Sequence, residues 1–397
     1  MSAVRVGANL LWLVPGVVGG SEEYSVRALE SLARLPQSRV AVTLFVNREL
    51  QRAHPDLLAS FPTVIGPLSG ESRARRVVTE ATWLARQARA ERLDLLHHLG
   101  GTMPVVRSTP GLVTIHDLQP FAFPEHFSRV KRAYLRATVP TSVKRAVVVI
   151  VLTEFIRQDV VERIGIDPEK ILLVPPGIDP PLPIDPAVAL ATRRRHGIGE
   201  APFFLYPAIT YAHKNHVSLV RAFGRVAAVD DRPKLVLTGG EADAEGALRT
   251  EISRLGLGDR VVRTGRVPRA DLDALFSEAR ALTFPSLYEG FGIPVLEAMS
   301  RGVPVIASAT AALPEVLGDA GVLVEPGDEV AWSDAMVRML DDDEHRAAMV
   351  ARGSRRAARF TWSASAEAML RAYEVAFVRL AEEGARDPAP FDPGVPS

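Results

Sequence analysis

Short apolar runs alternate along almost the whole chain with stretches in which apolar residues recur every three or four positions. A short apolar run predicts a buried strand, and the longer period predicts an amphipathic helix. Strands that alternate with helices are typical of βαβ units and parallel sheets. The predicted strands are residues 4–11, 40–46, 93–99, 112–116, 147–153 and 171–174 in the first half, and 203–207, 234–238, 260–264, 281–285, 303–307 and 322–324 in the second.

A proline-rich connector separates the two sets of strands. Residues 175–186 hold six prolines in twelve positions, which neither a helix nor a central strand tolerates. We therefore predict two doubly wound α/β domains, over residues 1–180 and 187–362. Residues 363–383 read as a further helix, and residues 384–397, with four prolines and no apolar period, are expected to be disordered.

The composition agrees with a two-domain chain and excludes some chemistry. The chain has 397 residues, 47% of them apolar, which is enough for two cores of ordinary size. It has no cysteine, so disulfides, zinc-thiolate sites and cysteine nucleophiles are excluded, and a cytoplasmic location is expected. The apolar segment 9–20 contains Pro15 and has no basic leader, so we expect neither a signal peptide nor a membrane span there.

Positive charge is concentrated in the first half of the chain. Residues 1–180 hold 22 Lys and Arg against 17 Asp and Glu, although the whole chain is neutral. Two predicted helices carry most of this excess, through Arg73, Arg75, Arg76, Arg86, Arg89 and Arg92, and through Arg129, Lys131, Arg132 and Arg136. They are either ordinary solvated helix faces or a surface for an anionic acceptor, such as a lipid diphosphate at a membrane. No aromatic residues interleave them, which disfavours nucleic acid.

Two carboxylates eight positions apart mark the most informative segment, SLYEGFGIPVLE at residues 286–297. It follows the predicted strand 281–285, so Glu289 is expected in a loop and Glu297 within the next helix. Each carboxylate can accept two hydroxyl hydrogen bonds, as a ribose diol or a hexose ring requires.

The glycines between these acids favour an anion site at the start of the helix. Gly290 and Gly292 allow backbone angles closed to other residues, and Pro294 suits the first helical position. The amides of Phe291, Gly292 and Ile293 can then face outward at the positive end of the helix dipole, where phosphate binds.

This segment resembles the signature of retaining glycosyltransferases of family 4, because Glu289 and Glu297 match the family's motif of two glutamates separated by seven residues. The resemblance implies the GT-B fold, two Rossmann-like domains facing across a cleft, with an N-terminal acceptor domain and a C-terminal nucleotide-sugar donor domain. It also implies that the helix at 363–383 crosses back onto the N-terminal domain. By the same resemblance Glu297 holds the nucleotide's ribose, while Glu289 and the amides that follow it contact the donor sugar.

A glycine loop lies between the first predicted strand and the next helix, in the sequence VPGVVGGSEE at residues 14–23. It has neither the spacing of a dinucleotide fingerprint nor a Walker lysine, which disfavours nicotinamide enzymes and P-loop ATPases. A plain turn explains it, but it also resembles the family's Gly-Gly loop, which implies that Gly19 and Gly20 lie near the donor diphosphate.

His116 and Asp117 end the predicted strand 112–116, at the sheet edge where open α/β sheets bind ligands. Such a pair is often structural, and Asp117 can equally cap a turn. The resemblance implies that the His116 loop is in the active site and that its histidine touches the donor sugar.

Lys214 precedes a predicted helix in the second domain, where an ammonium can pair with a diphosphate leaving group. It matches the family's phosphate-binding lysine, whereas Thr210 stands near the place where many relatives have a second, arginine contact. The resemblance further implies donor contacts at Gly239 and Val267, each after a predicted strand. Neighbouring His213 and His216 are expected to pack or cap.

We expect no metal ion and no cofactor, because the nucleoside diphosphate sugar is a co-substrate. Asp271 and Asp273 have the spacing of a metal-binding Asp-x-Asp motif, but they open a helical pattern, so helix capping explains them better.

The sequence therefore predicts a metal-independent, retaining hexosyltransferase acting on a glycan or lipid-linked acceptor. The HDL and HKN loops, at residues 116–118 and 213–215, are similar to those of polysaccharide mannosyltransferases, which favours GDP-mannose as donor. Two alternatives stay open: a sugar-nucleotide epimerase or phosphorylase of the same fold, and a non-catalytic subunit that binds nucleotide sugars. The expected location is cytoplasmic, with peripheral membrane contact through the basic N-terminal domain.

Overall fold

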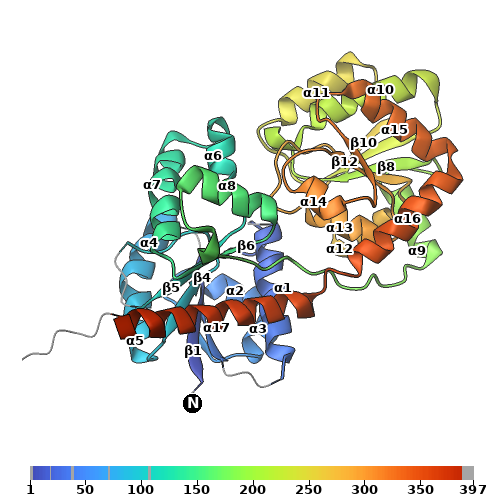
Figure 1. The fold of residues 1–397 in the computed structure, drawn as a ribbon. Coiled ribbons are helices and arrows are strands. Elements are labelled where there is room, and N and C mark those ends of the chain that lie inside the picture. Colours follow the sequence, from blue (N-terminus) through green and yellow to red (C-terminus); the bar gives the residue numbers. More distant parts are fainter. Residues whose placement is uncertain (1–2, 18, 37–39, 70–71, 106–108, 387–397) are drawn as a thin grey trace, which may run out of the picture. The chain divides into compact units, whose positions relative to one another are not determined.

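The computed structural model describes residues 3–17, 19–36, 40–69, 72–105 and 109–386, which form two compact units. The first contains the described residues of Met1–Phe121, Phe127–Gly177 and Trp362–Ser397. The second contains Ala122–His126 and Ile178–Thr361. The unit boundary thus lies at Ile178, inside the proline-rich connector, and both units are α/β (Figure 1).

The first unit is built on a parallel sheet of seven strands in the order β3-β2-β1-β4-β5-β6-β7. Its strands are β1 (Val4–Leu10), β2 (Val40–Val46), β3 (Thr63–Ile65), β4 (Leu95–His98), β5 (Gly111–Ile115), β6 (Val148–Val151) and β7 (Ile171–Leu173). The central strands β5 and β6 are mostly apolar and buried on both faces, as helices on both sides of a parallel sheet require, and β4 is equally buried although it contains His97 and His98.

Helices connect these strands and cover the sheet. They are α1 (Gly20–Arg34), α2 (Arg48–Ala53), α3 (Pro55–Ala59), α4 (Arg73–Thr79), the π-helical turn η1 (Glu80–Leu84), α5 (Ala85–Ala90), α6 (Gln119–Ala122), α7 (Arg129–Arg145), α8 (Glu154–Ile164), the 3₁₀ turn η3 (Pro168–Lys170) and α17 (Trp362–Arg386). The arginine-rich helix expected before β4 is therefore interrupted by one π turn, and Arg92 lies beyond its end.

The second unit has a parallel sheet of six strands in the order β10-β9-β8-β11-β12-β13. These are β8 (Phe203–Pro207), β9 (Lys234–Thr238), β10 (Val261–Gly265), β11 (Ala281–Phe284), β12 (Val305–Ser308) and β13 (Val322–Val324). The helical segments are η2 (Pro124–His126), α9 (Pro186–Arg195), η4 (Ala212–Lys214), α10 (His216–Val229), α11 (Glu245–Arg254), α12 (Arg269–Glu278), α13 (Ile293–Ser300), α14 (Leu313–Leu317), α15 (Glu329–Asp341) and α16 (Asp343–Ala357).

Each sheet has one point at which the strand order reverses. In the first unit the chain adds strands outward from β1 and then returns to β4 on the other side, and in the second unit β8 and β11 are the corresponding pair. Because crossovers are right-handed, the helices that connect strands on one side of this point cover one face of the sheet, and those on the other side cover the opposite face. The two sets of connections therefore diverge at the carboxyl ends of the two central strands, where ligands bind in open α/β sheets. The fold therefore prepares one ligand position in each unit.

Every predicted strand forms, with ends shifted by at most two residues. The pattern missed β3, a three-residue strand at the sheet edge that is too short to show a period. Helix α17 begins at Trp362 and ends at Arg386, so it extends three residues into the segment expected to be disordered. The rest of that segment, residues 387–397, lies outside the described residues.

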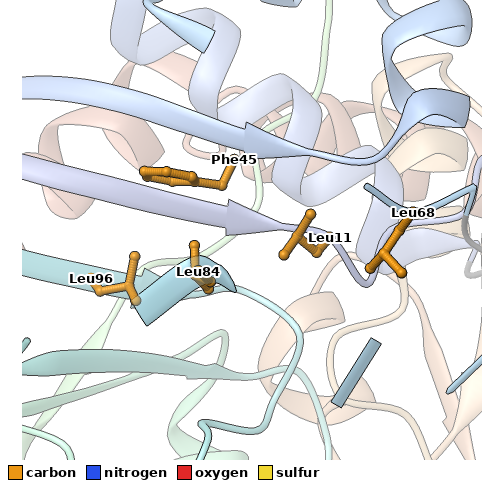
Figure 2. Packing of buried hydrophobic residues seen from close by; sticks show 5 residues of the cluster. All are labelled: Leu11, Phe45, Leu68, Leu84 and Leu96. Atoms are coloured by element: carbon orange, nitrogen blue, oxygen red, sulfur yellow. The ribbon is translucent and has the colours of Figure 1, made fainter. Parts of the chain in front are cut away.

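A compact apolar cluster packs the helix before β4 onto the first sheet. Figure 2 shows its buried members, which come from β2, β4, η1 and two loops: Leu11, Phe45, Leu68, Leu84 and Leu96. Trp83 completes it, with its ring edge-on to Phe45 at a centroid distance of 6.3 Å. Each buried leucine contributes about 1.5–3 kcal/mol of burial free energy, so this cluster fixes the position of η1.

Helix α17 belongs to the first unit and packs against α1 (Figure 1). A buried polar contact reinforces this packing, because His97 Nδ1 lies 2.9 Å from the hydroxyl of Tyr373 on α17. The other ring nitrogen, Nε2, lies 2.7 Å from Thr114 Oγ1. Burial lowers the pKa of His97 to about 3, so the ring is neutral at pH 7 and one nitrogen must accept a hydrogen bond.

Among the described residues, no helix combines the length and the apolar character needed to cross a membrane.

Replacing Tyr373 by phenylalanine removes the hydroxyl next to His97 while keeping the ring in the core. We expect the first unit to lose about 1–3 kcal/mol of unfolding free energy, because a buried ring nitrogen is left without a partner. Urea denaturation followed by intrinsic fluorescence measures the loss.

The matched control is Tyr134→Phe on α7, because no hydrogen bond of the Tyr134 hydroxyl occurs within the described residues. Equal effects of the two variants would contradict a specific role of the contact between Tyr373 and His97.

Candidate functional site

Lys214 and Glu289 meet at the reversal point of the second sheet. Lys214 ends the η4 turn that follows β8, and Glu289 lies in the loop after β11. Strands β8 and β11 are parallel neighbours, so both loops leave the same edge of the sheet. Lys214 Nζ lies 2.6 Å from Glu289 Oε1, and the two side chains are only 19% and 13% exposed. A mostly buried cation and anion are thus held together where a ligand is expected.

Tyr206, on β8, fixes the backbone of both loops. Its hydroxyl donates to the carbonyl oxygen of Lys214 at 2.7 Å and lies 3.1 Å from Ser286 Oγ. Burial raises the pKa of Tyr206 well above its ordinary value, so the hydroxyl keeps its proton and stays a donor. The backbone position of Lys214 therefore depends on a side chain that sequence reasoning did not single out.

Asn215, directly after Lys214, joins its loop to the loops after β11 and β13. It has a left-handed backbone with φ of 57°, which asparagine tolerates better than most residues. Its Nδ2 donates to the carbonyl oxygens of Pro285 and Pro326, each at 3.2 Å. In addition, the amide of Leu287 donates to the carbonyl of His213 at 2.8 Å. These bonds make the loops one rigid structure.

Helix α13 begins directly after the glycines of this site. Gly292 is its N-cap, with φ of 95°, and a Cβ there would lie 2.8 Å from Leu313 Cδ2, so both conformation and space require glycine. The helix starts at Ile293, so Pro294 occupies the second helical position rather than the predicted first one. The first amides of α13 have no carbonyl partners within the helix, which suits an anion.

Phe291 has a structural role in this turn, because its side chain is buried and lies edge-on to Phe360 at a centroid distance of 5.7 Å. Gly290, next to it, is half-buried. The side chain of Phe291 thus anchors the loop, and only its backbone amide is left for the predicted ligand contact.

Glu297 lies on α13, almost completely buried at 4% exposure. Its Oε1 lies 2.7 Å from Nη2 of Arg269 on α12, a distance that makes an ion pair although the two groups are not aligned as a hydrogen bond. Arg269 also pairs with Asp273 at 3.1 Å. Arg269 could not be predicted as a site residue, since nothing in the sequence brings its helix next to α13.

The two aspartates of the Asp-x-Asp spacing have partners of their own. Asp271 does not cap α12, whose N-cap is Pro268; it binds Arg195 at 2.8 Å and His196 at 2.9 Å. The expectation of capping was therefore wrong, because these two side chains at the end of α9 hold the carboxylate. In the part of the chain that the structure describes, no group of three or more His, Asp or Glu side chains could hold a metal ion.

Gly239 and Val267 follow β9 and β10 at the same sheet edge. Gly239 has φ of 138°, and a Cβ there would collide with the carbonyl oxygen of Ala208. Its amide donates to the carbonyl of Gly265 at 2.8 Å. Glycine is therefore required at position 239 so that the ends of three strands can meet, whatever ligand binds. Val267 is half-buried just before α12.

Thr210 occupies the place where many family members have an arginine. It is buried, and its Oγ1 accepts a hydrogen bond from the amide of Ala242 at 2.8 Å. It therefore fixes the loop after β9 and adds no positive charge. His213 adds none either, because burial and then the nearby Lys214 charge lower its pKa to about 3. Lys214 is consequently the cation beside Glu289.

His116 lies in the first unit, directly after β5. Its Nε2 lies 2.8 Å from the carbonyl oxygen of Leu99, so Nε2 carries the hydrogen and Nδ1 is the acceptor. The ring is edge-on to Tyr24 at a centroid distance of 5.4 Å, although part of the residue stays exposed. Burial lowers its pKa to about 4, so His116 is neutral at pH 7.

The other predicted residues of the first unit lie at loop positions. Asp117 Oδ1 accepts a hydrogen bond from the amide of Gln119 at 3.0 Å, which is the turn-capping role considered as the alternative. Gly19 is the exposed N-cap of α1, with φ of 62° and open space where a side chain would be, and Gly20 is the first helical residue. His116, Asp117, Gly19 and Gly20 thus share the carboxyl edge of one sheet, while Lys214, Glu289 and Glu297 belong to the other unit.

Replacing Tyr206 by phenylalanine removes the two hydroxyl contacts and keeps the ring. We expect the amides of residues 212–216 and 286–289 to exchange about 5- to 30-fold faster, because the loops lose about 1–2 kcal/mol of local stability. Hydrogen–deuterium exchange measures this. The control is Tyr211→Phe, since Tyr211 is 44% exposed; unchanged exchange in Tyr206→Phe would refute the role given to Tyr206.

Comparison with known proteins places this chain among enzymes of one family. The profile of "Glycosyl transferases group 1" matches residues 190–356, and that of "Glycosyltransferase Family 4" matches residues 18–181. O-antigen chain mannosyltransferase B of Escherichia coli is 30% identical over 286 residues, which cover 71% of this chain and 74% of the relative. O-antigen chain mannosyltransferase RfbU of Salmonella typhimurium is 26% identical over 324 residues, covering 80% and 86%.

A solved structure shares the fold. The HepE protein of Anabaena, solved in complex with UDP and glucose, superposes with a TM-score of 0.72 at 18% identity, covering 94% of this chain and 99% of that one. The two doubly wound parallel sheets, the two matching profiles and the E. coli relative agree. The chain has the GT-B fold and belongs to glycosyltransferase family 4.

Proposed function

We propose that this glycosyltransferase moves a hexose from a nucleoside diphosphate sugar to a hydroxyl of a glycan or lipid-linked acceptor, with retention of the anomeric configuration. The observation that carries the proposal is the contact between Lys214 and Glu289 beside the N-terminus of α13, at the reversal point of the second sheet. A diphosphate needs positive charge and backbone amides, and a sugar needs hydrogen-bond acceptors; this site has both.

Lys214 and the start of α13 would stabilise the leaving group. The ammonium has three hydrogens and donates one to Glu289, so two are left for phosphate oxygens. As the bond to the anomeric carbon breaks, negative charge grows on the diphosphate, and the lysine and the helix dipole offset it. Glu289 would hold sugar hydroxyls and keep the ammonium in place before the donor arrives.

Glu297 would bind the ribose of the nucleotide. Burial strengthens its hydrogen bonds, and each carboxylate oxygen has two lone pairs, so a ribose diol can bind beside Arg269. Gly239 and Val267, at the same sheet edge, would line the nucleotide.

In the first unit, His116 and the glycine loop offer groups that suit the donor sugar and its diphosphate. Because His116 is neutral and its Nδ1 is an acceptor, it suits a sugar hydroxyl better than a phosphate. Gly19 and Gly20 expose the N-terminus of α1, which suits the diphosphate. Attack of the acceptor from the face that the diphosphate leaves gives a retained product.

We infer GDP-mannose as donor and polysaccharide synthesis as context, supported by the two related O-antigen chain mannosyltransferases. A cytoplasmic location with peripheral membrane contact through the basic first unit also belongs to the proposal. Exposed Arg129 and Arg136 on α7 support it, and co-sedimentation with anionic vesicles measures it.

The proposal is tested by incubating the protein with GDP-mannose or UDP-glucose, with and without an acceptor sugar. Release of the free nucleotide that rises well above slow donor hydrolysis when acceptor is added, and a product of unchanged anomeric configuration by NMR, supports it. An altered donor sugar without acceptor identifies an epimerase, acceptor-independent binding without turnover identifies a binding subunit, and inverted product refutes retention.

Replacing Glu297 by glutamine should weaken donor binding about 10- to 100-fold, because hydrogen bonds to a charged group contribute about 1.5–3 kcal/mol. Arg269 keeps Asp273 as its partner, so the variant leaves no arginine without a counter-charge. Calorimetric titration with the donor measures the change. The control is Glu278→Gln, whose carboxylate pairs with Arg193 at 35% exposure; unchanged affinity in Glu297→Gln would disprove the ribose assignment.

Chelation should leave the reaction rate unchanged, because Lys214 and α13 supply the positive charge that a divalent ion supplies in other transferases. The measurement is nucleotide release in excess EDTA, against a magnesium-supplemented sample. Loss of activity with EDTA and its return with magnesium would show that a metal ion is required.

A further inference from the structure

The first sheet has a reversal point of its own, between β1 and β4, which the donor site of the second unit does not use. Asn9 and His98 are paired in register there, Asn9 second from the end of β1 and His98 at the end of β4. Both are polar residues in apolar strands, 1% and 3% exposed. Since open α/β sheets bind ligands at this place, the two residues lie where a ligand site is expected.

Both the nitrogen and the oxygen of the Asn9 side-chain amide contact neighbouring polar groups. Its Nδ2 donates a hydrogen bond to Glu80 Oε1 at 3.1 Å and also lies 3.1 Å from His98 Nδ1. Its Oδ1 accepts a hydrogen bond from the amide of Leu11 at 3.1 Å. The amide thus has a fixed orientation, and it holds one oxygen of Glu80 in one place.

Glu80 begins the π-helical turn η1 within the arginine-rich helix. A π turn inserts one extra residue, is rare, and occurs frequently at functional sites. Here it lets Glu80 point to the strand ends while Leu84, at the end of the same turn, packs in the apolar cluster of Figure 2. The carboxylate is therefore placed by a departure from regular helix geometry.

This arrangement is costly for stability. Glu80 is 6% exposed, and within the described residues its carboxylate forms no ion pair and no hydrogen bond except that from Asn9. Burial raises its pKa, against smaller opposing effects of Arg76 and Asn9. The folded state then binds the proton more tightly than the unfolded state, so stability falls as pH rises above the ordinary pKa of glutamate. A neutral side chain would serve a structural role better.

Two buried hydrogen-bond donors, one on α4 near Glu80 and one just beyond the end of β1, have no acceptor among the described residues. Arg76, one turn earlier on α4, has a buried Nε with no acceptor, and the buried Nε1 of Trp12 has none either. The Trp12 indole lies on Gly100, where a Cβ would come within 2.5 Å of its Cγ. Beside the strand ends there is thus a half-buried aromatic ring, an unpaired carboxylate oxygen and donors without partners, which together suit a sugar ring.

We propose that Glu80, held by Asn9 at the carboxyl ends of β1 and β4, binds a hydroxyl of the acceptor sugar, with Trp12 packing against the sugar ring. This rests on the proposed function, because it gives the first unit the acceptor of the same transfer. Glu80 acts here as a specificity residue: it selects and orients the acceptor and takes no part in donor binding.

The test is Glu80→Gln, which keeps the shape and the hydrogen bond from Asn9 but removes the charge. The acceptor probes are octyl α-mannoside, octyl β-glucoside and octyl β-galactoside, with GDP-mannose and UDP-glucose as donors. Initial rates give KM for donor and acceptor separately, and slow hydrolysis of the donor by water reports the donor site alone. The matched control is Glu91→Gln, in the turn after the same helix, with a 38% exposed side chain that pairs with Arg5.

We expect Glu80→Gln to raise the acceptor KM about 10- to 100-fold, since a hydroxyl loses a charged partner. Donor KM and donor hydrolysis should stay at the wild-type values, and the melting temperature should not fall. Glu91→Gln should behave as wild type. Should Glu80→Gln fail to fold, Glu80→Asp provides the second variant, with a raised acceptor KM and an unchanged donor KM expected, because the shorter side chain withdraws the carboxylate from the hydroxyl.

Three results would overturn the inference: unchanged acceptor KM in a folded Glu80→Gln protein, an equal loss of transfer and donor hydrolysis, or a wild type that transfers to none of the glycosides although it hydrolyses a donor. Failure of the proposed function looks different, because the wild type would then neither transfer nor hydrolyse a donor: it would bind no nucleotide sugar, bind one without turnover, or alter the donor sugar without an acceptor.

Discussion

The ion pair of Lys214 and Glu289 is the contact on which the rest of the donor site depends. A cation and an anion so poorly exposed are stable only when each has the other and when the surrounding backbone keeps them in reach. Tyr206 and Asn215 supply that restraint by joining the loops after β8 and β11. The pair also means that the lysine is already in position before any ligand binds, so binding needs little reorganisation.

Charge is distributed differently in the two units. In the second unit the buried ionic groups have partners: Lys214 with Glu289, Glu297 with Arg269, and Asp271 with Arg195. The buried histidines do not add charge, since burial lowers the pKa of His213 to about 3 and of His216 to about 4. In the first unit Glu80 has a single hydrogen bond and no ion pair within the described residues. A buried carboxylate with so few partners is characteristic of ligand sites, which is the basis of the acceptor role proposed for Glu80.

Much of the fold could be predicted from the sequence alone, because a parallel strand that is buried on both faces usually has a continuous run of apolar residues. The run at 203–207 and that at 234–238 became β8 and β9 without a shift. The three-residue β3 and the π turn at Glu80 could not, since neither leaves a periodic signal. Arg269 and Tyr206 could not be predicted for another reason. Glu297 lies 28 positions from Arg269, and Lys214 and Ser286 lie 8 and 80 positions from Tyr206, so only the packing of helices and loops aligns the side chains.

By itself the sequence determined the strand-helix alternation, the segment of residues 286–297 with its two acids, and the family to which these belong, because local patterns and motifs are properties of neighbouring residues. Only the tertiary structure decided which charges touch. Lys214 and Glu289 are 75 positions apart, and they meet because parallel strands bring their carboxyl ends to one edge where the strand order reverses. Asn9 and Glu80 are 71 positions apart, and they meet because the π turn lies against the end of β1. The strand order is fixed by how the strands pair, which no single segment of the chain contains.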